Sequence, residues 1–109
     1  SPWIADDPEV RAGAIDAAGD VPRREFQKIF QALYRFDPPD LGHVEAPTLA
    51  IHGTGESPFV KRQGRHLVET IDSAAIEAVP DAAHLVNLDN PEAFNARLAE
   101  FLADLDLAA

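Results

Sequence analysis

Two short apolar runs, residues 46–52 and 75–79, form the most regular pattern in the chain. Each run is followed at once by polar, turn-forming residues, and apolar side chains recur at helical spacing in the segment 58–71 between them. The pattern predicts a strand, a helix and a second strand, with Gly64 permitting close packing of the helix on the sheet. A right-handed crossover makes the strands parallel, and the continuous apolar run of the first strand predicts that this strand is buried on both faces.

The beginning of the chain is predicted to be helical after an extended lead-in, which Trp3 and Ile4 anchor in a groove. Asp7 and Pro8 form a cap-plus-proline start. Gly19 is the expected C′ stop of this helix. Its apolar positions are mostly alanine, so we expect a partly exposed helix.

Two more amphipathic helices are predicted, one over residues 23–36 and one beginning at Asn90-Pro91. The first has an apolar stripe of Phe26, Ile29, Phe30 and Leu33, and the second has one of Phe94, Leu98, Phe101, Leu102 and Leu105. The opposite face of the first is basic, with Arg23, Arg24, Lys28 and Arg35. That face is interpreted either as a solvated surface or as a binding patch.

Two prolines and a glycine interrupt regular structure at residues 37–42. We therefore expect a helical segment over 1–42 and a strand–helix–strand–helix unit over 43–109. Two parallel strands are not a self-sufficient sheet, because edges and faces need cover. The pattern resembles the end of a larger α/β sheet.

Composition narrows the classes of partner for this chain of 109 residues. Its formal charge of −10 argues against binding nucleic acid or an anionic membrane surface. Without cysteine there is no disulfide and no thiolate metal site, which fits a cytoplasmic protein. No apolar run approaches the roughly 20 residues that span a bilayer.

Glu56 and His84 each follow the carboxyl end of a predicted strand, where open parallel sheets place their chemistry. His84 is interpreted either as a general base and acid or as a structural cap of the next segment. Glu56 is either the carboxylate that orients this imidazole or a solvated acid at a helix start. Spacing alone leaves both pairs of alternatives open.

Other candidate sites are weaker. The spacing of the four histidines does not match that of metal ligands, so no metal or cofactor is expected. These histidines are His43, His52, His66 and His84. The segment Gly53-Thr54-Gly55 lacks the lysine and serine or threonine of a phosphate loop. Ser57 precedes Pro58 outside any Gly-x-Ser-x-Gly motif, which favours a helix cap over a nucleophile.

The ordered motifs of the second half resemble the carboxyl-terminal third of an α/β-hydrolase. They are Ala-Pro-Thr-Leu-Ala-Ile-His-Gly at 46–53 with Glu56, Pro-Asp-Ala-Ala-His-Leu-Val at 80–86, and Asn-Leu-Asp-Asn-Pro-Glu-Ala-Phe-Asn at 87–95. In that superfamily the triad acid lies three residues after the His-Gly turn, and a Pro-Gly-x-Gly-His type loop carries the triad histidine. The resemblance covers about residues 23–105 and is closest to the enol-lactonase, non-haem haloperoxidase and esterase branch.

The resemblance implies that His84 is the triad base and Glu56 the triad acid, and that residues 23–40 are a remnant of the cap region. It also implies a missing first part, with the oxyanion loop and the nucleophilic serine. Glu56 departs from the usual aspartate, and 81–83 depart from the usual glycines.

Our leading hypothesis is therefore the carboxyl-terminal part of a serine hydrolase for an ester, lactone or related carbonyl substrate. The chain alone is expected to be inactive, and its partner would be the amino-terminal part of the same fold. The alternative is a non-catalytic binding or assembly module that pairs through an open sheet edge with a partner or another copy.

Overall fold

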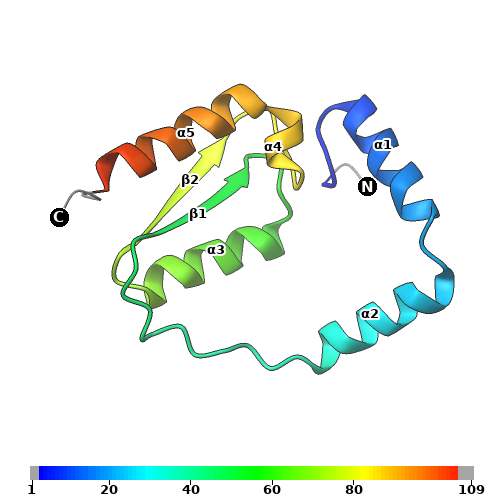
Figure 1. Cartoon of the computed structure of the whole chain (residues 1–109), viewed down its shortest axis with the longest axis horizontal. Coiled ribbons are helices and arrows are strands. Elements are labelled where there is room, and N and C mark those ends of the chain that lie inside the picture. Colours follow the sequence, from blue (N-terminus) through cyan, green and yellow to red (C-terminus); the bar gives the residue numbers. More distant parts are fainter. Residues whose placement is uncertain (1–2, 106–109) are drawn as a thin grey trace.

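A computed structural model describes residues 3–105, in which a two-stranded parallel sheet lies between helices (Figure 1). The elements in chain order are α1 (Pro8–Gly19), α2 (Arg23–Arg35), β1 (Thr48–Gly53), α3 (Pro58–Thr70), β2 (Ala74–Val79), α4 (Val86–Asp89) and α5 (Pro91–Asp104). Strands β1 and β2 pair along their whole length, and Gly53 lies opposite Val79 at their carboxyl ends. The predicted strand–helix–strand unit with parallel strands is confirmed.

Helices α3 and α5 cover opposite faces of the sheet (Figure 1). On one face, a Cβ atom added at Gly64 of α3 would lie 2.9 Å from Cδ1 of Ile76, so the predicted close packing at this glycine is confirmed. On the other face, Ile51 packs with Phe94 of α5 against a small buried cluster. Ile76 is in register with Ala50, the neighbour of Ile51, so the two isoleucines point to opposite faces.

The apolar run of β1 predicts that this strand is buried on both faces, and the strand is less buried than predicted. Residues 48–52 are only half-buried, and full burial begins at Gly53. Within residues 3–105 the sheet has no third strand, so the outer edge of each strand lacks a neighbour. The fully packed part of the core is correspondingly small and centres on Val79, Ala82 and Val86.

Helix α1 begins as predicted, because the Asp7 carboxylate accepts a hydrogen bond from the Glu9 N–H at 2.8 Å. Its end differs from the prediction. Gly19 is the last helical residue and has no positive φ, and the N–H groups of Asp20 and Val21 donate to the carbonyls of Ala17 and Ala18. The helix therefore ends on an ordinary right-handed turn rather than on a left-handed glycine.

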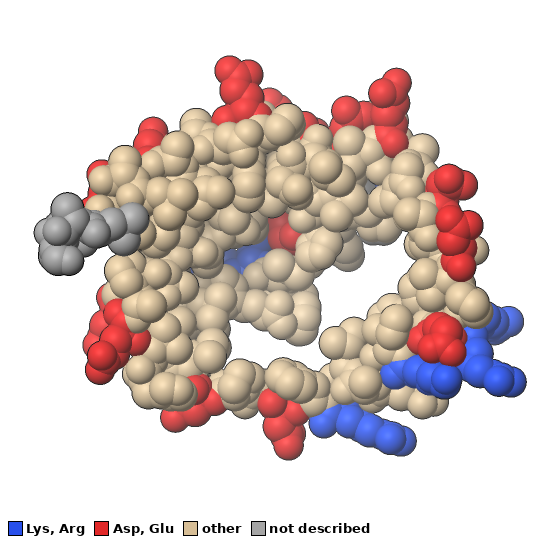
Figure 2. All heavy atoms as spheres, viewed as in Figure 1, with Lys and Arg blue, Asp and Glu red and all other residues tan. Residues whose placement is uncertain are grey.

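Helix α2 stands away from the sheet on two connecting segments (Figure 1). Its apolar stripe is uncovered, with Phe30 52% and Leu33 62% exposed. Figure 2 shows an opening between α2 and the sheet, and the Lys and Arg side chains of α2 point away from it. The radius of gyration is 16.2 Å, against about 13 Å for a compact domain of this size. The structure is thus more open than a fully packed domain.

The start of α5 and the irregular segment in the middle of the chain are as the sequence predicts. Asn90 caps α5 by accepting the Ala93 N–H at 3.3 Å, and residues 36–47 contain no helix or strand, as expected for the break at 37–42. The division into two units at residue 42 stays a prediction. Within residues 3–105, no helix has the length and apolar character to cross a membrane.

The first testable prediction concerns Gly53, where β1 meets the loop after β2. A Cβ atom at this position would overlap the backbone of Ala82 and Ala83, and both alanines are almost fully buried. We expect Gly53→Ala to lower the free energy of unfolding by about 1–3 kcal/mol or more, measured by urea denaturation. Gly13→Ala is the matched control, because a Cβ there meets nothing within 4 Å and alanine favours a helix. Equal stability of the two variants would contradict the close approach.

Candidate active site

Glu56 and His84 lie in contact, although 28 residues separate them in sequence. Oε2 of Glu56 is 2.8 Å from Nδ1 of His84. Glu56 follows β1 and His84 follows β2, so parallel pairing brings both loops to the same edge of the sheet. The catalytic roles assigned to this pair stay predictions, but the pair itself is a defined feature of the structure.

The two members of the pair differ strongly in exposure. Glu56 is only 6% exposed, whereas the side chain of His84 is 59% exposed. The second carboxylate oxygen of Glu56 accepts the backbone N–H of Ser57 at 2.9 Å. Both oxygens of a buried carboxylate therefore have donors, which offsets the cost of removing its charge from water.

Two backbone hydrogen bonds join the two loops, and the histidine loop itself is tightly packed and sharply turned. The N–H of Thr54 donates to the Val79 carbonyl at 2.9 Å, and the N–H of Gly55 donates to the Ala82 carbonyl at 2.8 Å. Ala82 and Ala83 are almost fully buried. Asp81 has a φ of 53°, which puts the turn before the histidine in the left-handed region that favours glycine. Aspartate is among the few other residues that adopt this region readily.

A segment distant in sequence contacts the histidine loop. The carbonyls of Trp3 and Ile4 accept the N–H groups of His84 and Leu85 at 3.0 and 2.9 Å. The sequence predicts a lead-in anchored by these side chains. In the structure the backbone of the lead-in is bonded to this loop, Ile4 is half-buried, and Trp3 is 53% exposed while Ala5 is buried.

Asp89, at the end of the short helix α4, is the polar residue at this site that sequence reasoning missed. Its carboxylate accepts the N–H groups of Asp6, Asp7 and Ala83 at 2.7, 3.0 and 2.9 Å. Partial burial raises the pKa of Asp89, but these hydrogen bonds and the charge of Arg11 outweigh it and hold the pKa below its usual value. No local signal in the sequence pairs Asp89 with residues more than 80 positions away.

The other sequence candidates do not join the pair. Ser57 caps α3, as predicted, because its hydroxyl accepts the Val60 N–H at 3.3 Å. His52 hydrogen bonds through Nδ1 to the Gly53 carbonyl, and His66 lies 3.4 Å from the Thr70 hydroxyl. In the part of the chain described, residues 3–105, no three acidic or histidine side chains gather where they could hold a metal ion.

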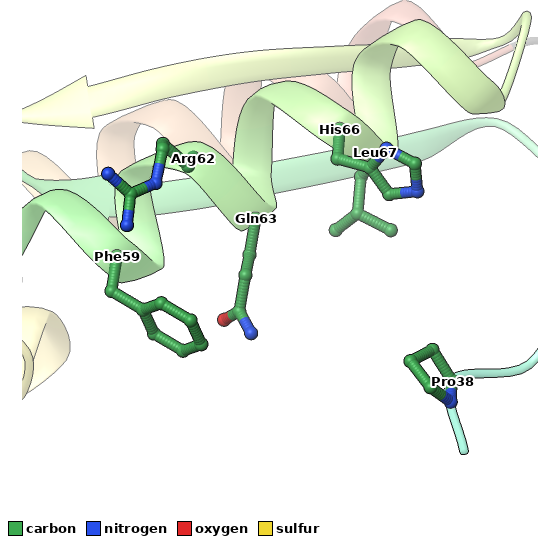
Figure 3. Close-up of a pocket in the computed structure, with 6 residues that line it drawn as sticks. All are labelled: Pro38, Phe59, Arg62, Gln63, His66 and Leu67. Atoms are coloured by element: carbon green, nitrogen blue, oxygen red, sulfur yellow. The ribbon is translucent and has the colours of Figure 1, made fainter.

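A pocket lies elsewhere, on the outer face of α3. It has a volume of about 520 Å³, and its lining residues are Pro38, Phe59, Arg62, Gln63, His66 and Leu67. Figure 3 shows Pro38 across an open space from the side chains of α3. None of these residues belongs to the Glu56–His84 pair, so the candidate site is defined by the pair and not by the pocket.

Comparison with known proteins found no match. No family model, no curated protein and no solved structure matches the chain.

The second prediction concerns the tautomer of His84. A glutamine at position 56 has one side-chain oxygen that can accept a hydrogen bond, and the Ser57 N–H can only donate one. The glutamine oxygen would therefore bond to the Ser57 N–H, and the glutamine NH₂ group would face Nδ1 of His84. We expect the neutral His84 ring to carry its proton on Nδ1 in the native chain and on Nε2 in Glu56→Gln. Nitrogen-15 NMR of the labelled ring in alkaline solution measures this, with His84→Gln to assign the signals. Glu69→Gln, an exposed charge-matched variant, should leave the native tautomer unchanged; a native ring protonated on Nε2 would refute the contact.

Proposed function

We propose that this chain supplies the acid and the histidine of a serine-hydrolase triad, as the carboxyl-terminal portion of an α/β-hydrolase. The observation that carries the proposal is the 2.8 Å contact between Glu56 and Nδ1 of His84, at the carboxyl ends of two adjacent parallel strands. This is where open α/β sheets place catalytic groups.

The chemistry follows from the two ring nitrogens of His84. With Nδ1–H donating to Glu56, Nε2 has a free lone pair, and the imidazole is more than half exposed. Nε2 can then take the proton of an attacking serine hydroxyl and return it to the leaving group. The buried Glu56 carboxylate fixes the tautomer and stabilises the imidazolium that forms. We propose an ester, lactone or related carbonyl as the substrate class.

Two backbone details support this proposal. Asp81, with its positive φ, stands where the resembling hydrolase pattern has a glycine, so the turn has the conformation for which glycine is suited. Gly53, where the pattern has its His-Gly turn, is the position at which a Cβ atom would overlap the histidine loop. Glutamate in place of aspartate lengthens the acid, yet its carboxylate reaches both its donors.

The nucleophile is the part that the described residues do not provide. The Ser57 hydroxyl caps a helix, and Ser73 donates to the Ala46 carbonyl at the amino end of the sheet. We therefore assign the serine to the amino-terminal part of the same fold. A cytoplasmic location stays a prediction from the cysteine-free sequence.

The third prediction is that the chain alone has no esterase turnover. With p-nitrophenyl acetate, its rate should equal that of His84→Ala, because a triad without its nucleophile retains only residual catalysis. Addition of a hydrolase fragment that carries a nucleophile elbow should produce activity, and His84→Ala should then lower it by about three orders of magnitude or more. Turnover by the chain alone that His84→Ala abolishes would contradict this assignment.

A second candidate function is a binding or assembly module. It is favoured by the unpaired outer strand edges and by the uncovered stripe of α2. Such surfaces bind a partner or another copy through strand addition or helix packing.

The fourth prediction separates the two functions by solution mass. An assembly module should form dimers or larger species in size-exclusion chromatography with light scattering, and Glu56→Ala should leave their mass unchanged. A monomer with a sharp unfolding transition would count against the module. The hydrolase assignment requires neither dimers nor larger species.

A further inference from the structure

The histidine loop is held from outside by the segment of residues 3–7, defined here as the strap. Two consecutive carbonyls of the strap, those of Trp3 and Ile4, accept the N–H groups of His84 and Leu85. The strap lies beside α4 at the tips of the two strands (Figure 1). The backbone of the candidate base is therefore bonded to a part of the chain about eighty residues away.

Side chains hold the strap through both its N–H groups and its carbonyl groups. The Asp89 carboxylate accepts the N–H groups of Asp6 and Asp7 at 2.7 and 3.0 Å. The Arg11 guanidinium donates to the Ala5 carbonyl through Nε at 3.1 Å and Nη2 at 2.9 Å, and to the Asp6 carbonyl at 3.3 Å. Hydrogen bonds to charged groups are stronger than neutral ones, so this arrangement resists rotation of the strap.

Asp89 also reaches the histidine loop directly. Oδ2 accepts the N–H of Ala83 at 2.9 Å as well as that of Asp6, so one oxygen joins the loop to the strap. Ala83 is the residue before His84, and its methyl group gives the loop no side-chain bond of its own. The loop therefore depends on Asp89 and the strap for its polar contacts on this side.

We propose that Asp89 and Arg11 are positioning residues that hold the His84 backbone so that Nδ1 meets Glu56 and Nε2 stays outward. This inference rests on the proposed function, because it concerns the same His84. Within residues 3–105, Asp89 and Arg11 hydrogen bond to the strap and to Ala83 and not to the imidazole or Glu56, so both act through the strap and the loop. A purely structural role would stabilise the fold without affecting the state of the ring.

The fifth prediction tests this role with Asp89→Asn and Arg11→Lys in the full chain. Asparagine has one acceptor oxygen for three N–H donors, and lysine lacks the planar fork that spans two carbonyls. We expect the Nδ1–H form of the neutral His84 ring to give way to a mixture dominated by Nε2–H. Amide exchange at His84 and Leu85 should be about tenfold faster, the loss expected from one hydrogen bond. Exchange in β1 and β2 should not change.

Glu100→Gln on the exposed face of α5 removes the same charge as Asp89→Asn and should leave both readouts native. If Asp89→Asn does not fold, Arg11→Lys carries the test, since it acts on the other side of the strap. Faster exchange with an unchanged tautomer would overturn the positioning role, and so would no change in either readout. A native chain whose ring is already protonated on Nε2 would instead contradict the Glu56–His84 pair and with it the proposed function.

Discussion

Parallel pairing of β1 with β2 is the constraint on which the rest of the site depends. The strands end in register, with Gly53 opposite Val79, so the loops that follow them begin side by side. Gly53 then allows the backbone of Ala82 and Ala83 to approach closely. A slip of one residue would turn every side chain of one strand to the opposite face and displace one loop against the other. The contact between Glu56 and His84 is a consequence of this register.

The electrostatic arrangement of the pair follows from where each group lies. Glu56 is buried, one of its carboxylate oxygens accepts the Ser57 N–H, and the other lies 2.8 Å from Nδ1 of His84, so these contacts hold the carboxylate in place. The side chain of His84 lies at the surface of the same site, where the proposed role as a base requires it to be accessible. A carboxylate held in place by a backbone N–H needs no rearrangement when the imidazole gains a proton. This preorganisation is what a base and its orienting acid require.

Sequence patterns predicted the elements well because their causes are local. Caps at Asp7, Ser57 and Asn90, and the helical period of α3 and α5, depend on residues within one or two turns. The Asp89 contacts and the strap join positions more than 80 residues apart, so periodicity carries no trace of them. Helix α4 is only four residues long, too short for a period to show. The stripe of α2 predicted a helix correctly but could not specify what would cover it.

The uncovered surfaces and the exposed imidazole of His84 point to one physical requirement. The outer edges of β1 and β2 have no strand beside them in residues 3–105, β1 is half-buried, and Phe30 and Leu33 of α2 are more than half exposed. A chain that buries so little has small hydrophobic stabilisation to set against its conformational entropy. The His84 imidazole is more than half exposed and follows β2 at the carboxyl end of the sheet. A polypeptide that added a parallel strand to β1 would cover apolar surface and bring its own carboxyl-end loop to the end of the sheet where His84 lies. Stability and a nucleophile would then come from the same addition.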